Sequence, residues 1–243
     1  MKQYQTEAIL LAVRDWSAAD RVVTLFSREY GKLMAMAYGV RRTRNSLSGS
    51  IQPFMHLDVY LSSGKNMETI KQCEVKNSFR KIRDNLECMA YSSFVAEIVS
   101  ELCPEHQPEP KVFDLLIHVF SLITDRNPRL VALAGAWQLL SLTGYQPECQ
   151  NCVLCGQKLN FPAYFDASSG GGVCRTCHHS GCLEFSQASS EFIEQLLSLD
   201  LEEPGHFIVG GATMLQSETI ITAYLLYCVD KPLKSLSFIK QLM

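Results

Sequence analysis

The first 76 residues carry short apolar or alternating runs that are separated by turn residues. Runs of this kind lie at residues 6–14, 20–28, 32–40, 54–62 and 67–75, with Ser, Gly, Asp, Asn and Pro between them. This spacing indicates five strands of a small β-barrel or sandwich. A five-stranded barrel of this length fits an oligonucleotide-binding (OB) fold, although SH3-like barrels share the strand count.

After residue 84 the hydrophobic period changes towards the 3.6 residues of an α-helix. Residues 85–103 offer one apolar face, and further helical patterns lie at 112–124, 128–144, 187–199, 216–230 and 232–243. The pattern therefore predicts an α+β protein. It has an N-terminal five-stranded OB-fold β-barrel over residues 1–80 and an α-helical domain over residues 81–243.

Composition places the chain among globular proteins, since 47% of its residues are hydrophobic. The longest apolar candidate for a membrane span, residues 220–229, is about half of the 18 residues that a transmembrane helix needs. The N-terminus shows no signal-peptide pattern. We therefore expect a cytoplasmic protein with no membrane partner and with reduced thiols.

Six of the ten cysteines lie in residues 149–182. Cys152 with Cys155 and Cys174 with Cys177 form two Cys-x-x-Cys pairs, 18 residues apart. Two such chelate loops supply the four tetrahedral thiolate ligands that zinc prefers. The spacing predicts one structural Zn²⁺ in a Cys₄ motif embedded in the helical domain. Four protein ligands leave no open position for water, which disfavours a catalytic metal.

Other ligand assignments remain open for this segment. Cys149 also forms a Cys-x-x-Cys with Cys152, and His178 and Cys182 follow the second pair. Any of these three could replace one of the four ligands. Unliganded thiols and a redox role are further alternatives to a zinc site.

Charge divides the chain sharply. Residues 1–83 hold 14 Lys and Arg against 7 Asp and Glu, whereas residues 84–243 hold 8 against 18. The asymmetry indicates a polyanionic partner for the N-terminal part, although a solvated basic face is the simpler alternative. The candidate DNA-binding residues are Lys32, Arg41, Arg42, Arg44, Lys65, Lys71, Arg80 and Lys81.

Aromatic residues are interleaved with this positive charge, a combination that is typical of proteins that bind single-stranded nucleic acid. Most of these rings are needed in the core, to which we assign Phe26 and Phe54; Tyr30 and Tyr38, near the basic loop, are the candidates for stacking on bases. Catalytic motifs are lacking: the sequence contains no phosphate-binding loop, nucleophile elbow or zinc-protease helix. The signature of a zinc deaminase is not in register either. We therefore expect no enzymatic activity.

Several motifs occur together in a specific order. They are AADRVVTLFSREYGKLMAMAYGVRR, SLSGSIQPF, CVLCG, GGGVCRTC and the terminal PLKSLSFIKQL. In this order and spacing the chain resembles, nearly end to end, the RecO family of bacterial DNA repair and recombination mediator proteins. Members of the family often carry further Lys or Arg in the loop where this chain has the neutral SLSGS.

The resemblance implies an OB fold, a helical domain and a zinc motif whose ligands fall on Cys152, Cys155, Cys174 and Cys177. It places the family's basic loop on Arg41, Arg42 and Arg44. It also implies a nucleoid-associated protein that binds single- and double-stranded DNA and anneals complementary strands. With RecR, such a protein helps to load RecA onto DNA coated by single-strand binding protein. The alternatives are a zinc-stapled scaffold that binds proteins without touching DNA, and a zinc-dependent enzyme acting on nucleic acid.

Overall fold

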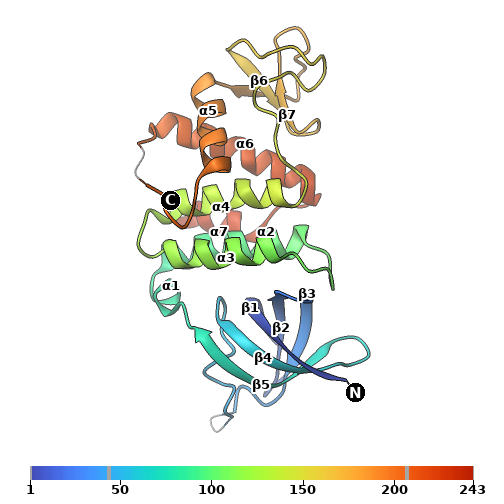
Figure 1. Ribbon diagram of the computed structural model, residues 1–243. Helices are drawn as coiled ribbons and strands as arrows, with labels where there is room; N and C mark the ends of the chain where they lie inside the picture. The colour runs from blue at the N-terminus through green and yellow to red at the C-terminus, as the bar shows by residue number, and fades with distance from the viewer. Residues whose placement is uncertain (1, 43–44, 206–207, 243) are drawn as a thin grey trace. The chain divides into compact units, whose positions relative to one another are not determined.

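The computed structural model describes residues 2–42, 45–205 and 208–242. The chain divides into two compact units (Figure 1). The first unit comprises residues 1–128 together with residues 235–243, and the second comprises residues 129–234. Each unit has its own buried core and is described by itself.

Five strands close into a barrel at the start of the first unit, which confirms the predicted fold class. They are β1 (Gln3–Asp15), β2 (Arg21–Ser27), β3 (Gly31–Ala37), β4 (His56–Ser62) and β5 (Glu68–Asn77). The order around the barrel is β1-β2-β3-β5-β4, and β1 pairs with β4 to complete it. The pairs are antiparallel except for the short parallel contact between β3 and β5.

The barrel interior is filled by alternate residues of the strands, such as Leu10, Leu25 and Val59, which are fully buried. Leu47 and Ile51 join this core from the loop between β3 and β4. The long loop is therefore anchored by its own apolar side chains, and its polar residues are left at the surface.

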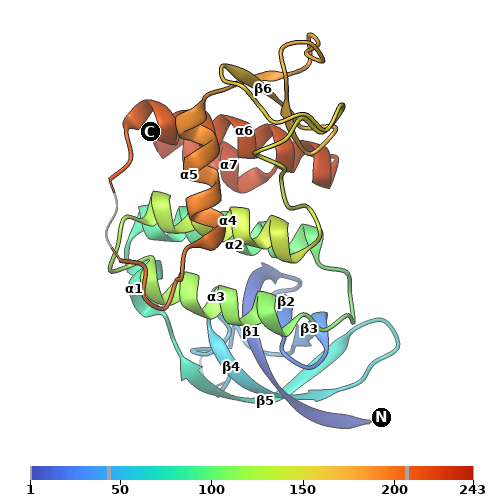
Figure 2. The same ribbon diagram turned by 45° about the horizontal axis from the view of Figure 1, so that its top comes forward.

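Ile9 and Phe26 are fully buried although they lie outside the barrel core. Alternation along a strand points them to the outer side of the barrel. Helices α2 (Leu86–Leu102) and α3 (Pro110–Leu122) lie against this side (Figures 1 and 2). Phe54 meets Phe120 of α3 edge-to-face, with 5.3 Å between ring centroids. Burial on both sides explains why β1 reads as a continuous apolar run.

A cluster of charged side chains, here named the Glu7 cluster, joins three strands on the outer side of the barrel. The Glu7 carboxylate accepts hydrogen bonds from His56 Nε2 at 2.7 Å, Lys76 Nζ at 2.8 Å and Arg28 Nε at 3.3 Å. Arg28 also pairs with Asp114 of α3, and its guanidinium lies 4.6 Å from the Phe113 ring centroid. These contacts tie the barrel to helix α3.

A single-turn helix, α1 (Arg80–Asp84), connects the barrel to α2 and buries Ile82. The last helix, α7 (Lys234–Leu242), also belongs to the first unit from residue 235 onward. The Ser235 backbone N–H and hydroxyl both donate to the Glu97 carboxylate of α2. The C-terminal segment is thereby fixed to the N-terminal unit.

The second unit contains three helices and a small sheet within its described residues. Its elements are α4 (Pro128–Leu142), β6 (Ala163–Asp166), β7 (Gly171–Val173), β8 (Leu183–Phe185), α5 (Gln187–Ser198) and α6 (Gly211–Val229). The three short strands pair in the order β7-β6-β8. Trp137 of α4 is fully buried and donates its Nε1–H to Ser217 of α6. None of the helices in the described ranges is long and apolar enough to cross a membrane.

Candidate nucleic-acid interface and metal centre

The predicted basic loop begins directly after β3 and lies against the turn that joins β1 to β2. The Arg41 N–H donates to the Ala19 carbonyl at 3.0 Å, and its Nη1 donates to the Ser17 carbonyl at 3.0 Å. The Gly39 N–H donates to the Asp20 carboxylate at 2.8 Å. This hydrogen bond, with one from Ser17, lowers the pKa of Asp20 below its ordinary value. The two loops therefore form one continuous edge of the barrel.

Two aromatic rings are exposed at this edge. Trp16 is 66% exposed and Tyr38 is 58% exposed. In the strand register, Arg21 of β2 lies opposite Asp15 of β1 and opposite Ala37 of β3. Trp16 and Tyr38 therefore each stand one residue beyond the same row of the sheet. We name Trp16, Tyr38, Arg41 and Arg42 the loop-end surface. Exposed rings beside guanidinium groups can stack on bases while the cations meet phosphates.

Trp16 was not singled out as a stacking residue by sequence reasoning, because a tryptophan is read first as a core residue. The available signal was local: the ring stands between Asp15 and Ser17, in a turn between two strands. Tyr30, the other predicted stacking residue, lies at the opposite end of β3, beyond its first residue Gly31. Its ring contacts that of Tyr4 at 4.5 Å between centroids.

Lys65 and Lys71 belong to the hairpin formed by β4 and β5, and both are exposed. The register between these strands shifts where Leu61 pairs with Ile70 and Tyr60 pairs with Gln72. Lys71 is therefore the extra residue of a β-bulge, a device that redirects a side chain at a sheet surface. The structure places both lysines on the barrel but not within the loop-end surface.

The remaining predicted contacts are engaged with other protein groups. Lys32 is half-buried and its ammonium donates to the Ser100 carbonyl of α2. Arg80 pairs with Asp84 at 3.4 Å, and Lys81 pairs with Asp125 at 3.4 Å. The last two pairs are well exposed, and exposed pairs of this kind contribute little to stability. Arg44, also predicted to contact DNA, lies outside the described residues.

The second unit brings the four predicted zinc ligands together. The Sγ atoms of Cys152, Cys155, Cys174 and Cys177 all lie within 4.8 Å of one another. The Cys155 and Cys174 Sγ atoms are 3.8 Å apart. Zn–S bonds of about 2.3 Å in a tetrahedron require sulfur atoms about 3.8 Å apart. The spacing therefore fits a four-coordinate metal ion.

Two glycines allow the turns that gather these thiols. The Gly156 N–H donates to the Cys152 carbonyl at 2.8 Å, with a φ of 73° that favours glycine. A Cβ at Gly171 would lie 2.6 Å from the Glu148 carbonyl oxygen and 2.7 Å from Val153 Cγ1. Gly171 thus lets the strand that precedes Cys174 run close to the first cysteine loop.

The four thiols influence one another's ionisation. Burial opposes ionisation of Cys152, but N–H groups of Cys174, Cys155 and Leu154 donate to it and lower its pKa to about 6. Hydrogen bonding to the Cys174 and Cys155 thiols raises the pKa of Cys177 to about 12. Four thiolates this close together would repel one another, and a divalent metal ion would remove that repulsion.

The three alternative ligands lie outside the group of four. Cys149 is buried, and burial raises the pKa of its thiol to about 12. The His178 ring lies against the Tyr164 ring, with centroids 3.8 Å apart. Cys182 is half-buried and is not among the thiols that the fold gathers. The donor set is therefore four sulfurs, which suits a closed structural site.

Comparison with known proteins places both parts of the chain in one family. The profile described as "Recombination protein O N terminal" matches residues 1–79, and "Recombination protein O C terminal" matches residues 83–237. The DNA repair protein RecO of Pelotomaculum thermopropionicum is 34% identical over 98% of this chain and 94% of its own length. That of Symbiobacterium thermophilum is 32% identical over 100% of this chain and 98% of its own length.

These matches run through the barrel, the helices and the cysteine segment alike, and they confirm the resemblance seen in the motifs. The barrel, the helices and the four-thiol group of this chain all lie within the matched residues, and the matched family has a role in DNA repair and recombination. The chain belongs to the RecO family of DNA repair proteins.

Proposed function

We propose that this chain is a non-enzymatic mediator of recombinational repair that binds single- and double-stranded DNA through its residues 1–80. The observation that carries this proposal is the loop-end surface, where Trp16 and Tyr38 are exposed beside Arg41 and Arg42. We assign the first contact with a single strand to this surface, and we infer from the sequence that Arg44, which lies outside the described residues, also contacts DNA.

The proposed mechanism follows from the chemistry of these groups. Guanidinium forks neutralise phosphates, and the two rings stack on the faces of bases. Neither contact uses the Watson–Crick edges, so a bound strand can pair with its complement, and the protein anneals strands. Lys65 and Lys71 extend the path over the barrel. Arg80 and Lys81 leave their weak surface ion pairs with Asp84 and Asp125 to bind phosphates. Lys32 is the least available of the predicted contacts, because its ammonium is bonded to the Ser100 carbonyl.

We assign the partners and the metal to residues 81–243. RecR and single-strand binding protein bind the chain, which acts in the cytoplasm at the nucleoid, and RecA is loaded as a consequence. The four thiols hold one Zn²⁺ that fixes the geometry of residues 149–182. A closed Cys₄ site offers the metal no position for water, so the zinc takes no part in chemistry.

Fluorescence anisotropy of a labelled single-stranded oligonucleotide tests the DNA site. We expect the R41E/R42E/R44E variant to bind far more weakly than wild type at every salt concentration. Each lost phosphate contact flattens the slope of log K against log salt by about 0.7. The matched control is R126E, an exposed arginine of the loop between α3 and α4. Equal binding and annealing by wild type and the triple variant would refute the proposal.

The second candidate function is a zinc-stapled scaffold that binds only proteins. It is favoured by one observation: Lys32, Arg41, Arg80 and Lys81 already have partners within the chain. The same titration separates the two functions, because the scaffold predicts no salt-dependent DNA binding by the wild-type chain.

A further inference from the structure

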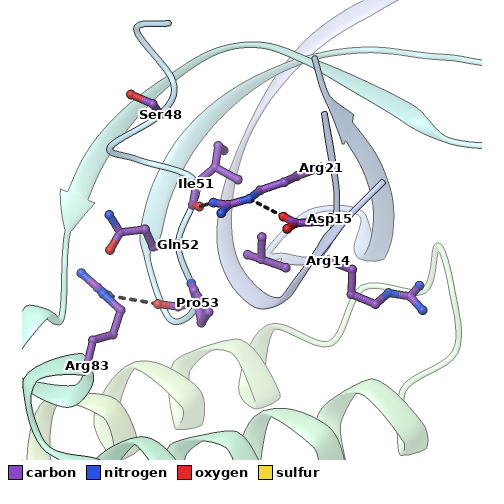
Figure 3. A pocket seen from close by; sticks show the side chains of 9 residues that line it. Arg14, Asp15, Arg21, Ser48, Ile51, Gln52, Pro53 and Arg83 are labelled. Atoms are coloured by element: carbon purple, nitrogen blue, oxygen red, sulfur yellow. Dashed lines mark hydrogen bonds and ion pairs between the residues drawn. The ribbon is translucent and has the colours of Figure 1, made fainter. Parts of the chain in front are cut away.

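A hollow of about 630 Å³ adjoins the loop-end surface at the barrel. Figure 3 shows its wall, which combines the end of β1, the start of β2, residues 48–53 of the long loop and Arg83 of α1. Arg14, Arg21 and Arg83 all line it. None of these arginines is among the predicted DNA contacts.

Two of the guanidinium groups are held in place by the same short segment. Arg21 Nη1 donates to the Ile51 carbonyl at 3.2 Å, and Arg83 Nη1 donates to the Pro53 carbonyl at 3.0 Å. In Figure 3 these two side chains approach residues 51–53 from different sides, whereas the Arg14 side chain extends away from that segment. Because residues 51–53 follow the buried anchor Leu47 and include buried Ile51, both cations are positioned by the barrel core.

The charges around the hollow are not balanced. Asp15 is the one acidic residue in its wall, and it is shared by Arg21 at 3.0 Å and Arg41 at 3.4 Å. Arg83 makes no ion pair within the described residues; its Nη1 is bonded to the carbonyls of Pro53 and Ser78. Burial lowers the pKa of this guanidinium, since it is half-buried and has lost solvent.

The charge of Asp84 favours the Arg83 cation without a direct ion pair, so an anion bound to Arg83 would further offset the cost of its desolvation. The Nη2 groups of Arg21 and Arg83 make no hydrogen bond to the part of the chain that the structure describes, so both have donors left for a ligand. Guanidinium forks match the oxygens of a phosphate group.

We propose that this hollow binds a phosphate group of a nucleic-acid strand, with Arg21 and Arg83 donating to its oxygens and Arg14 adding positive charge beside it. The inference rests on the proposed function, because a strand stacked on Trp16 passes the neighbouring residue Asp15, which lies in the wall of the hollow. The hollow adds an anion site, whose donors are held in place by the chain, to the exposed loop-end surface.

The experiment compares R14Q/R83K with wild type by anisotropy of a labelled single-stranded oligonucleotide over a range of salt. Lysine at position 83 keeps the charge and removes the planar fork. The single variant R14Q, at an exposed position, serves if the double variant fails to fold. We expect about tenfold weaker binding by the double variant and a slope flattened by about 0.7 per phosphate. R126Q is the matched arginine control and should bind as wild type does.

Oligonucleotides with a 5′-phosphate or a 5′-hydroxyl distinguish the two sources of the phosphate. A larger loss with the phosphorylated strand assigns the hollow to a strand end, and an equal loss assigns it to an internal phosphodiester; both support the site. Unchanged binding by R14Q/R83K and R14Q, with R41E/R42E/R44E impaired, would overturn the hollow and leave the proposed function standing. If the wild-type chain binds no DNA, both fall.

Discussion

The Glu7 cluster and the four-thiol group are both gatherings of ionisable side chains, and they are neutralised in different ways. In the barrel, the carboxylate of Glu7 meets three cationic or hydrogen-bonding partners that the chain itself supplies. In the second unit, four thiols face one another and no cationic side chain lies in the group. The comparison teaches that the Glu7 cluster is neutralised by side chains of the chain itself, whereas the four thiols could be neutralised by an added metal ion.

Metal removal should separate the two regions most strongly. Structural zinc contributes about 10–16 kcal/mol in zinc-finger peptides, more than the stability of many domains. We expect a chelator, or the variant C155S/C174S, to abolish amide-exchange protection in residues 149–182 and to leave β1–β5 protected. Hydrogen exchange read by mass spectrometry measures both regions at once. C182S is the matched control, and unchanged protection in C155S/C174S would contradict a structural metal.

Breaking the barrel cluster should have a smaller, local effect. E7Q removes the negative charge and leaves Arg28 and Lys76 without it. We expect the free energy of unfolding to fall by about 1–3 kcal/mol. Denaturant titration followed by circular dichroism measures this loss. E74Q, at an exposed position of β5, is the control and should change stability little.

Acidification should weaken the barrel in two stages. Burial lowers the pKa of His56 below its ordinary 6.5, although the Glu7 carboxylate opposes this and Lys76 and Arg28 favour it. Stability is therefore present above pH 6.5 and falls as the pH drops below it, because the unfolded state binds the proton more readily. Burial would raise the pKa of Glu7, but hydrogen bonds from Lys76 and His56 lower it below 4.5.

The Glu7 contribution is therefore present above pH 4.5 and is lost as the pH falls further. Melting temperature against pH records both stages. H56Q should remove the upper stage and keep the lower one. The ordinary pKa values, about 6.5 for His and about 4.5 for Glu, place the upper stage between pH 7 and pH 5. A melting temperature that rises on acidification over this range would contradict the lowered pKa of His56.

The smallest effect on stability is expected at the loop-end surface, which belongs to neither cluster. W16A removes a ring that is 66% exposed, so the free energy of unfolding should be nearly unchanged. DNA affinity should fall about tenfold, since a stacked base contributes about 1–3 kcal/mol. Y227A, which removes a ring that is 57% exposed on α6, is the control for both measurements. Equal losses of affinity in the two variants would argue against stacking on Trp16.

The regular elements could be read from the sequence because each carries its own period. The expected strand at 54–62 is β4 (His56–Ser62), and the expected helix at 85–103 is α2 (Leu86–Leu102). The cysteine group could be read because ligand spacing is itself a geometric constraint. Short elements that depend on tertiary contacts could not be predicted from the sequence. Helix α1 is one turn held by buried Ile82, and the strands of the β7-β6-β8 sheet have only three or four residues, too few to show a period.

The candidate DNA site was predicted in part, for a related reason. Sequence shows which residues carry charge, but ion pairing is decided by partners far along the chain. Lys32 was expected at a DNA surface and lies against Ser100 of α2. Arg83 is not among the expected contacts, because its place beside Pro53 depends on the packing of α1. The division at residue 80 stays a prediction about function, while the compact units divide at residue 128.

The return of α7 to the first unit has a consequence for the order of synthesis. A ribosome releases the barrel strands and α2 long before residues 235–242, so the hydrogen bonds from Ser235 to Glu97 form only after residues 129–234 have been made. The second unit, which is formed by the intervening residues 129–234, can fold during that interval. The N-terminal unit is therefore begun first and finished last.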